Sequence, residues 1–380
     1  MADRETEFVA KIASGVSGLN ATAWDRLTDG GDPFVTHAFL SALEESGSVG
    51  SDSGWIPASI LVEDDASHLL AAAPAYLKSH SQGEYVFDHG WAEAWERAGG
   101  AYYPKLQVAV PFTPVPGPRL LGSRPQHLLA AIESVTVQNE LSSAHITFAD
   151  EPAAAEADRR GWLTRHGIQY HWFNRDYSSF DEFLGALRSS KRKEIRKERA
   201  GARQGLDFVA LRGAEIGPHD WDAMWAFYQD TGSRKWGHPY LTREFFDIVG
   251  EKLGEKLLLL LALRDGRPIA GALNLIGWDT LYGRYWGCIE EVEFLHFELC
   301  YYQALEWAIE HGLKSVQAGA QGEHKLARGY EPVVTKSVHF IPNPNFRKAV
   351  ADFLEAERAG VEQEIRWLRN SLPYRFSSPA

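Results

Sequence analysis

The apolar run at residues 257–263 limits the possible fold more than any other feature of this sequence. It is far too short to span a bilayer and has the length of a buried strand. The turn Asp265-Gly266 separates it from a second apolar segment at 269–276, and a third follows at 281–288. Short apolar segments joined by tight polar turns are typical of antiparallel strands. The sequence therefore predicts a strand meander in the second half of the chain.

A helix is predicted directly after these strands. Apolar residues recur at helical spacing from 294 to 309, and His311-Gly312 is a typical helix-ending signal. Short strands are expected at 315–319 and 333–341, on either side of a compact polar segment. The order is thus hairpin, strand, long helix, strand, short link and strand.

The first half repeats this order loosely. It has a hairpin at 56–62 and 69–77, strands near 85–87 and 105–110, a helix at 125–139 and a strand at 144–148. A chain of 380 residues suits two domains. We therefore predict a mixed α/β fold of two similar domains, residues 1–172 and 173–380. The second domain opens with a basic lead-in helix and closes with an amphipathic helix from about 346 to 368.

Composition excludes several classes of protein. The net charge of −12 argues against broad, non-specific nucleic-acid binding. The N-terminus is too acidic for a secretory signal, and no 18-residue apolar stretch could span a bilayer. Cys288 and Cys300 form neither a disulfide framework nor a metal-ligand spacing. The sequence indicates a reduced, cytoplasmic protein without a membrane span or a metal.

One segment departs from the acidic background. Residues 188–203 hold eight Lys and Arg and two Glu. In a helix, Arg192, Arg196, Arg199 and Arg203 would share one face. Such a stripe could grip a tRNA acceptor stem, CoA phosphates or a nucleotide-linked acceptor, and the alternative is a solvated helix face. The predicted phosphate- or tRNA-binding residues are Lys191, Arg192, Lys193, Arg196, Lys197 and Arg199.

Several segments resemble a known family. They are Asp181-Glu-Phe-Leu, Lys191 to Arg199, Tyr102-Tyr-Pro-Lys-Leu106, Arg234-Lys-Trp-Gly237, Tyr282-Gly-Arg-Tyr-Trp-Gly-Cys288 and Gly319 to Tyr330. Over nearly its full length the chain resembles the FemAB-like predicted N-acyltransferases, which are related to the Fem transferases that add amino acids to peptidoglycan precursors. The resemblance implies two tandem GNAT-like acyltransferase domains, and it leaves the substrate open.

A second resemblance concerns residues 318–330. This segment looks like the end of the aminoacyl-tRNA–protein transferase fold, where a Gln at a strand end helps to activate the attacking amine. By position Gln321 matches that residue, but the Asp usually found two residues earlier is Gly319 here.

The loop before the long helix is unsuited to CoA. Ordinary GNAT enzymes hold the CoA pyrophosphate on backbone N–H groups of a Gly-rich loop at this place. Here the loop carries Glu290, Glu291 and Glu293 and has no glycine run. Three carboxylates would repel the phosphates. A segment at 115–124 with two arginines is an alternative phosphate loop or a plain turn.

Acyl transfer to an amine needs a neutral nucleophile, a polarised carbonyl and a route for the proton. Polar groups suited to these roles gather after a strand end and inside an apolar sheet. An Arg within such a sheet needs a ligand or a buried carboxylate such as Glu298 as a partner, and Tyr282 and Arg284 are expected on one face of their strand. The predicted catalytic residues are Gln321, His324, Lys325, Arg284 and Glu298.

A wider set of residues is predicted to bind substrate, either at the rim of the second domain's cleft or in the first domain. These residues are His80, Asp88, Tyr103, Lys105, Arg234, Lys235, Trp236, Tyr285, His296, Arg328 and Tyr330.

The sequence thus predicts an N-acyltransferase that acts by direct attack of an amine, without a covalent enzyme intermediate. Aminoacyl-tRNA is the expected donor and the only co-substrate required besides the amine. An acyl-CoA or acyl-carrier donor is the first alternative. The second is a non-catalytic protein that binds peptides or cell-wall fragments.

Overall fold

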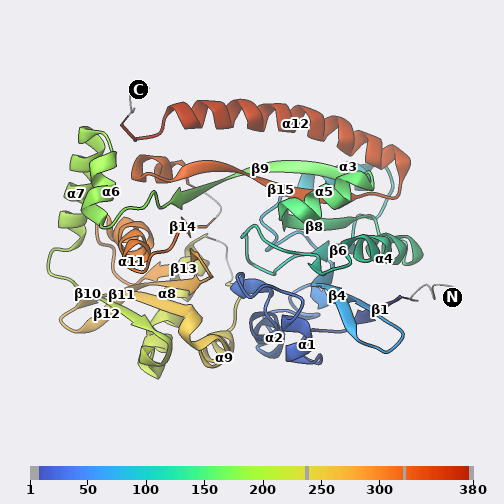
Figure 1. Cartoon of the computed structure of the whole chain (residues 1–380), viewed down its shortest axis with the longest axis horizontal. Coiled ribbons are helices and arrows are strands. Elements are labelled where there is room, and N and C mark those ends of the chain that lie inside the picture. The colour runs from blue at the N-terminus through green and yellow to red at the C-terminus, as the bar shows by residue number, and fades with distance from the viewer. Residues whose placement is uncertain (1–7, 236–238, 320–321, 376–380) are drawn as a thin grey trace, which may run out of the picture. The chain divides into compact units, whose positions relative to one another are not determined.

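The computed structural model describes residues 8–235, 239–319 and 322–375, with backbone only for 233–235. The chain divides into two compact units, the first comprising Met1–Gly167 and Val334–Glu362 and the second Ile168–Val333 and Gln363–Ala380. Strand β9 (Leu163–Phe173), strand β15 (Glu331–Phe340) and helix α12 (Pro344–Asn370) each contain residues of both units (Figure 1). The boundary expected after residue 172 therefore falls inside β9.

The first unit is built on two sheets. Strands β2 (Trp55–Pro57), β5 (Ala75–Lys78), β6 (Lys105–Val108), β8 (Ala144–Ala149) and β15 pair in that order, and only β6 and β8 run parallel. A second sheet has the order β1 (Val9–Ala13), β3 (Ser59–Glu63), β4 (Leu69–Ala73) and β7 (Leu121–Gly122). The helices are α1 (Ala21–Asp25), α2 (His37–Glu45), α3 (His89–Arg97), α4 (Pro125–Gln138) and α5 (Glu151–Arg159).

The second unit contains the predicted meander. Its sheet has the order β10 (Asp207–Arg212), β11 (Leu257–Arg264), β12 (Arg267–Ile276), β13 (Thr280–Cys288), β14 (Ser315–Gln317) and β9. All neighbours are antiparallel except β13 and β14. The helices are α6 (Phe180–Ala186), α7 (Ser189–Ala202), α8 (Pro218–Lys235), α9 (Arg243–Leu253), α10 (Leu295–Phe297), a π-helical turn (Glu298–Gln303) and α11 (Ala304–Glu310), and a 3₁₀ helix spans Glu323–Arg328.

Helices cover both faces of the meander because β11 and β12 are apolar on both sides. Leu258 and Leu260 belong to the core that also holds the residues of α11, whereas Leu261 lies against α8. The backbone of α8 approaches β13 closely at Gly287, where an added Cβ would lie 1.9 Å from the carbonyl oxygen of Phe227. Glycine at this position therefore permits the close packing of α8 on the sheet.

Three sequence predictions fail locally. The hairpin expected at 56–62 and 69–77 is divided, because β2 and β5 pair in one sheet whereas β3 and β4 pair in the other. The strand expected near 85–87 is an irregular segment, because Tyr85 has a φ of 59°, which is incompatible with extended backbone. The single long helix expected at 294–309 is divided into α10, the π-helical turn and α11. The strands expected in the second half and the basic lead-in helix are confirmed.

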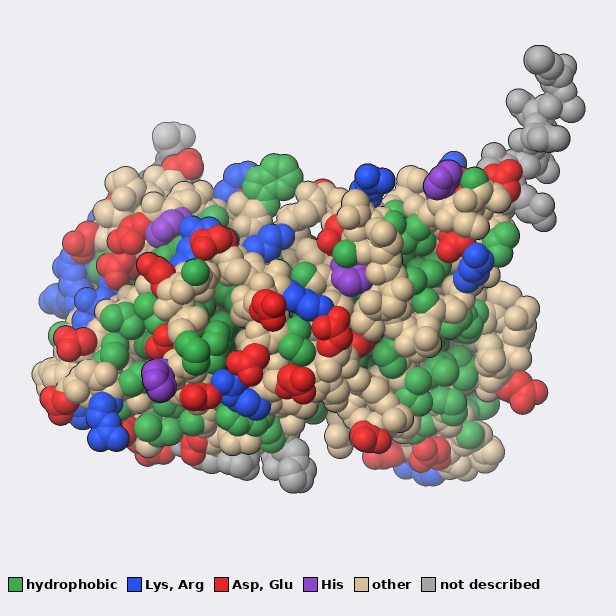
Figure 2. All heavy atoms as spheres, turned by 90° about the horizontal axis from the view of Figure 1, so that it is seen from below, with side chains coloured by type: hydrophobic (Ala, Val, Ile, Leu, Met, Phe, Trp, Pro, Cys, Tyr) green, Lys and Arg blue, Asp and Glu red, His purple; other side chains and the backbone are tan. Residues whose placement is uncertain are grey.

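The surface carries mixed charge. On the face shown in Figure 2, acidic side chains are spread among basic ones, in keeping with the net charge of −12. Within the described residues, every helix is too short or too polar to cross a bilayer.

Candidate functional site

The second unit has a small cavity beside the point where β13 and β14 meet. These parallel strands pair over three positions only, from Thr280 opposite Ser315 to Tyr282 opposite Gln317. The cavity has a volume of about 140 Å³. Its walls come from β12, β13, α10, the π-helical turn and the two residues after β14. The lining residues are Ala272, Leu273, Asn274, Gly283, Arg284, Tyr285, Trp286, His296, Cys300, Tyr301, Ala318 and Gly319.

A β-bulge shapes one wall of this cavity. Leu273 pairs with Tyr285 and Asn274 pairs with Gly283, so Arg284 is the extra residue of β13. The bulge interrupts the regular alternation from which Tyr282 and Arg284 were predicted to share a face. Arg284 does line the cavity, as its predicted role in catalysis requires.

Sequence reasoning missed Asn274 on the facing strand. Its side chain is buried, and its Nδ2 donates to the carbonyls of Ala272 at 3.1 Å and Leu258 at 3.3 Å. A single amide within the apolar segment 269–276 was the available signal, because a buried polar group needs partners or a ligand.

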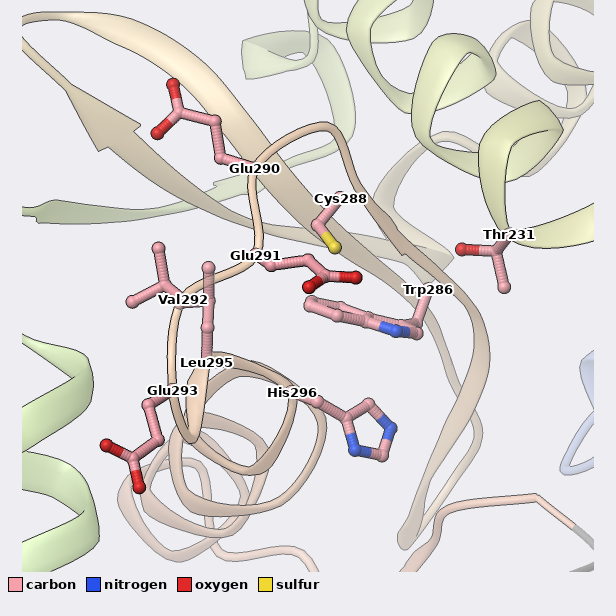
Figure 3. A pocket seen from close by; sticks show the side chains of 9 residues that line it. All are labelled: Thr231, Trp286, Cys288, Glu290, Glu291, Val292, Glu293, Leu295 and His296. Atoms are coloured by element: carbon pink, nitrogen blue, oxygen red, sulfur yellow. The ribbon is translucent and has the colours of Figure 1, made fainter. Parts of the chain in front are cut away.

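A larger pocket adjoins the small cavity and shares Trp286 and His296 with it. It has a volume of about 600 Å³. Figure 3 shows the Glu291 carboxylate near the Trp286 ring, and in this view the His296 ring lies below that indole, with 5.1 Å between the two ring centres. The complete lining is Thr231, Trp286, Cys288, Glu290, Glu291, Val292, Glu293, Leu295 and His296.

The three carboxylates of this pocket make it unsuited to phosphates. Glu290 forms an ion pair with Arg264 at 2.9 Å, so one of the charges is compensated at the rim. The geometry agrees with the expectation that a CoA pyrophosphate does not bind at this loop in the usual GNAT manner.

The turn after β14 contributes two of the predicted catalytic residues. The Nε2 atom of His324 lies 2.8 Å from the Tyr301 hydroxyl, and Lys325 donates to the carbonyl of Gly319 at 2.7 Å. Lys325 is buried, and burial lowers its pKa to about 8. Tyr301 and Gly319 line the small cavity, so both pairs reach its wall. Gln321 lies outside the described residues.

Glu298, also predicted to be catalytic, is the centre of a buried ion-pair cluster. Its carboxylate accepts from Arg199 at 3.1 Å and Arg203 at 2.8 Å, and Glu306 shares both arginines. Glu298 is fully buried and lines neither cavity. Glu298, given as an example of a carboxylate that could partner Arg284, pairs with Arg199 and Arg203 instead.

The same cluster divides the predicted arginine stripe of α7. Arg199 and Arg203 turn toward carboxylates of the unit, and Arg196 pairs with the exposed Asp181 at 3.0 Å. Lys191 pairs with Glu194 at 2.8 Å on the same helix. Lys193 and Lys197 are exposed and Arg192 is half-buried. Neither cavity is lined by a residue of α7.

Arg328, predicted to bind substrate, is held inside the unit. Its guanidinium forms an ion pair of 2.7 Å with Glu198 of α7 and lies 3.5 Å from the centre of the Phe297 ring. Glu198 also accepts from the Tyr302 hydroxyl. The sequence analysis did not single out Glu198, because a Glu inside a basic segment gives no sign of a partner 130 residues away.

The other predicted binding residues of the second unit differ in position. His296 and Tyr285 line the small cavity, and His296 also lines the larger pocket. Tyr330 is fully buried, and its ring lies 5.6 Å from that of Tyr301. Trp236 and the side chains of Arg234 and Lys235 lie outside the described residues.

The predicted binding residues of the first unit form a separate buried cluster. The Lys105 ammonium contacts Ser81 at 2.8 Å, Glu84 at 2.8 Å and Asp88 at 2.5 Å, and Tyr103 contacts Ser81 at 2.8 Å. Burial raises the pKa of Glu84 to about 7. Burial also favours neutral Asp88, but Lys105 outweighs it and holds the pKa of Asp88 below its usual value.

His80 lies beside this cluster. Its Nδ1 atom is 3.5 Å from the Lys78 ammonium, and its Nε2 atom lies 3.0 Å from the carbonyl of Ser53. Lys105 binds one oxygen of Glu84 and one of Asp88, whereas the other oxygen of each carboxylate is buried without a hydrogen-bond partner among the described residues. A role of this cluster in binding the acceptor stays a prediction.

Comparisons with known proteins agree with this architecture. A family model named FemAB-like and described as peptidoglycan biosynthesis/recognition matches residues 15–376. No curated protein sequence matches the chain.

Among solved structures, FemX is 12% identical over 91% of this chain and 100% of its own, with a TM-score of 0.54. A protein of unknown function from Bacteroides thetaiotaomicron is 10% identical over 87% and 99% of the two chains, with a TM-score of 0.51. L-PGS from Bacillus licheniformis is 11% identical over 86% and 98%, with a TM-score of 0.50. At these identities the matches concern the fold alone, and the predicted mixed α/β fold with GNAT-like sheets is confirmed.

Proposed function

The chain belongs to the FemAB-like family of GNAT-type acyltransferases, and on that premise we propose that it transfers an acyl or aminoacyl group to an amine by direct attack. The observation that carries the proposal is the pair of adjoining cavities in the second unit, which share Trp286 and His296. A two-substrate reaction needs two binding spaces that meet at the reacting atoms.

The larger pocket suits the amine. An aliphatic amine is protonated near neutral pH, and the carboxylates of Glu291 and Glu293 attract such a cation. The Trp286 ring adds an aromatic face to the same pocket, which favours a cation further. The amine would then reach the small cavity past Trp286 and His296.

The small cavity suits the acyl group. Arg284 stands in its wall and supplies positive charge where the carbonyl oxygen becomes negative during attack. Lys325 does not line the cavity itself, and its ammonium donates to the carbonyl of Gly319, which does. Its positive charge therefore lies next to the cavity wall. Asn274 supports the bulge that presents Arg284.

Lys325→Met is expected to lower turnover by about 10²-fold and to raise the free energy of unfolding at pH 7. Burial lowers the pKa of Lys325 from 10.5 to about 8, so the folded state binds this proton more weakly than the unfolded state. The free-energy cost of burying the charged Lys325 ammonium is present in full below pH 8 and disappears as the pH rises to about 10.5. Its upper bound is about 3 kcal/mol.

Urea unfolding of both proteins at pH 7 and pH 9.5 checks this expectation. The wild type should gain more stability between the two values than Lys325→Met, and the difference reports on Lys325, because Lys78, whose pKa burial lowers to about 7, titrates in both proteins. A variant that is less stable than the wild type at pH 7 would show that Lys325 has a structural role instead.

We propose aminoacyl-tRNA as the donor. The acidic loop disfavours CoA phosphates, and Lys193 and Lys197 remain exposed on α7 for a phosphate backbone. An acyl-CoA donor is the second candidate, because Arg199 and Arg203, half of the expected stripe, are engaged by Glu298 and Glu306.

Incubation with labelled aminoacyl-tRNAs and, in parallel, labelled acyl-CoAs in the presence of mixed amines separates the donors. We expect release of label from aminoacyl-tRNA, reduced in Lys193→Ala/Lys197→Ala and weakened by salt. Consumption of acyl-CoA alone would contradict the tRNA donor. If neither donor is consumed and Arg284→Ala only weakens the binding of a peptide or cell-wall fragment, the protein is a binding module.

A further inference from the structure

The hydroxyl of Tyr301 is placed between the small cavity and the surface. Tyr301 is 3% exposed and lines the cavity, and its hydroxyl lies 2.8 Å from Nε2 of His324. His324 is exposed to solvent at the start of the 3₁₀ helix. The pair thus connects a buried space to water through one hydrogen bond.

The local backbone explains this placement. Tyr301 belongs to the π-helical turn Glu298–Gln303 between α10 and α11. Such a turn inserts one residue into a helix, changes the direction in which its side chains point, and is frequent at functional sites. The ring of Tyr301 is held by Phe297, stacked at 6.0 Å, and by Tyr330 at 5.6 Å. The hydroxyl is therefore fixed rather than free to rotate away.

We propose that Tyr301 and His324 carry the proton away from the attacking amine, with Tyr301 as the group that touches substrate and His324 as the proton acceptor behind it. The inference deepens the proposed acyl transfer and depends on it. The bound ammonium first loses one proton to solvent. The neutral amine then attacks the acyl carbon of an ester or thioester, the N–C bond forms, and the carbonyl electron pair moves to oxygen. The proton on nitrogen passes to the Tyr301 oxygen as the phenolic proton passes to Nε2 of His324.

The remaining steps balance the reaction. The carbonyl re-forms, the C–O or C–S bond to the donor breaks, and the leaving alkoxide or thiolate takes a proton from solvent. The imidazolium of His324 loses its proton to water and returns to the neutral form. Burial raises the pKa of Tyr301 well above its usual value, so the phenol stays protonated and serves as a conduit rather than as the base.

The surroundings are compatible with this role. Charged and titratable groups approach the pair from α10, the π-helical turn, the 3₁₀ helix and the residue before β15. They are His296, Cys300, Arg328, Lys325 and Tyr330. The guanidinium of Arg328 donates to the carbonyl of His324 at 2.8 Å, which holds the backbone of the histidine in place. The proton acceptor thus has a fixed position against the phenol.

Two variants test the relay. Tyr301→Phe keeps the ring and its packing but removes the hydroxyl, and His324→Gln removes the titrating group at an exposed position. With the donor that the wild type consumes, each should lower kcat by 10²–10⁴-fold with KM changed less than threefold. The double variant should be no slower than the slower single one, because the two groups act in series. His311→Gln, at the exposed end of α11, is the matched control and should keep wild-type kinetics.

The pH profile distinguishes proton transfer from packing. The wild-type kcat should fall at acidic pH as His324 becomes protonated, and both variants should lose this limb. Wild-type kcat and an unchanged acidic limb in either variant would overturn the relay while leaving acyl transfer intact. If the wild type consumes no donor, the proposed acyl transfer is wrong, and the relay that depends on it is wrong as well. Titration of the His324 ring by NMR in the wild type and in Tyr301→Phe then still reports whether the hydrogen bond exists.

Discussion

Glu298→Ala is expected to lower the free energy of unfolding by about 3–5 kcal/mol. Glu298 is fully buried and accepts hydrogen bonds from Arg199, Arg203 and Gln303. Its removal leaves Arg199, whose side chain is only 12% exposed, with Glu306 as its remaining carboxylate. A buried charge that loses its partner keeps the full cost of desolvation.

The matched control is Glu306→Ala. Glu306 binds the same two arginines, but its side chain is 33% exposed, so water can replace it. The expected loss is about 0–1 kcal/mol. Urea unfolding followed by tryptophan fluorescence measures both variants, and Glu298→Gln serves if the alanine variant does not fold. A Glu298→Ala protein of nearly wild-type stability that has lost all turnover would instead restore Glu298 as a catalytic residue.

The role of Glu298 shows where sequence reasoning ends. Its place at the start of the predicted helix and its charge suited catalysis equally well, and its partners lie about 100 residues earlier in the chain. The buried ion pair between Glu198 and Arg328 spans 130 residues in the same way. Local periodicity carries no information about such contacts, because they depend on how the elements pack.

Elements with a strong period were predictable. The strands β11, β12 and β13 follow directly from their apolar runs. The bulge at Arg284 could not be predicted, because one extra residue interrupts the side-chain alternation of a strand without changing its composition. The unit boundaries inside β9, β15 and α12 were also beyond a prediction that assigns domains in chain order.

The second large effect is expected from Gly283→Leu. A Cβ at this position would lie 3.4 Å from Oδ1 of Asn274 and 3.5 Å from Cα of Ala318, both residues of the small cavity. These are ordinary contact distances, so alanine fits. A leucine side chain extends further into a space of about 140 Å³ and leaves no room for an acyl group. Turnover should fall by about 10²-fold or more, since misplacement of the reacting atoms by about 1 Å already has an effect of this size.

The central claim is that acyl transfer takes place in the small cavity lined by Gly283, Arg284 and Tyr301. The most direct measurement compares kcat for the wild type, Gly283→Ala and Gly283→Leu with one donor and amine, alongside the free energy of unfolding of each. We expect Gly283→Ala to keep most of the activity and Gly283→Leu to lose it while remaining folded. A folded Gly283→Leu protein with wild-type kcat would contradict the claim.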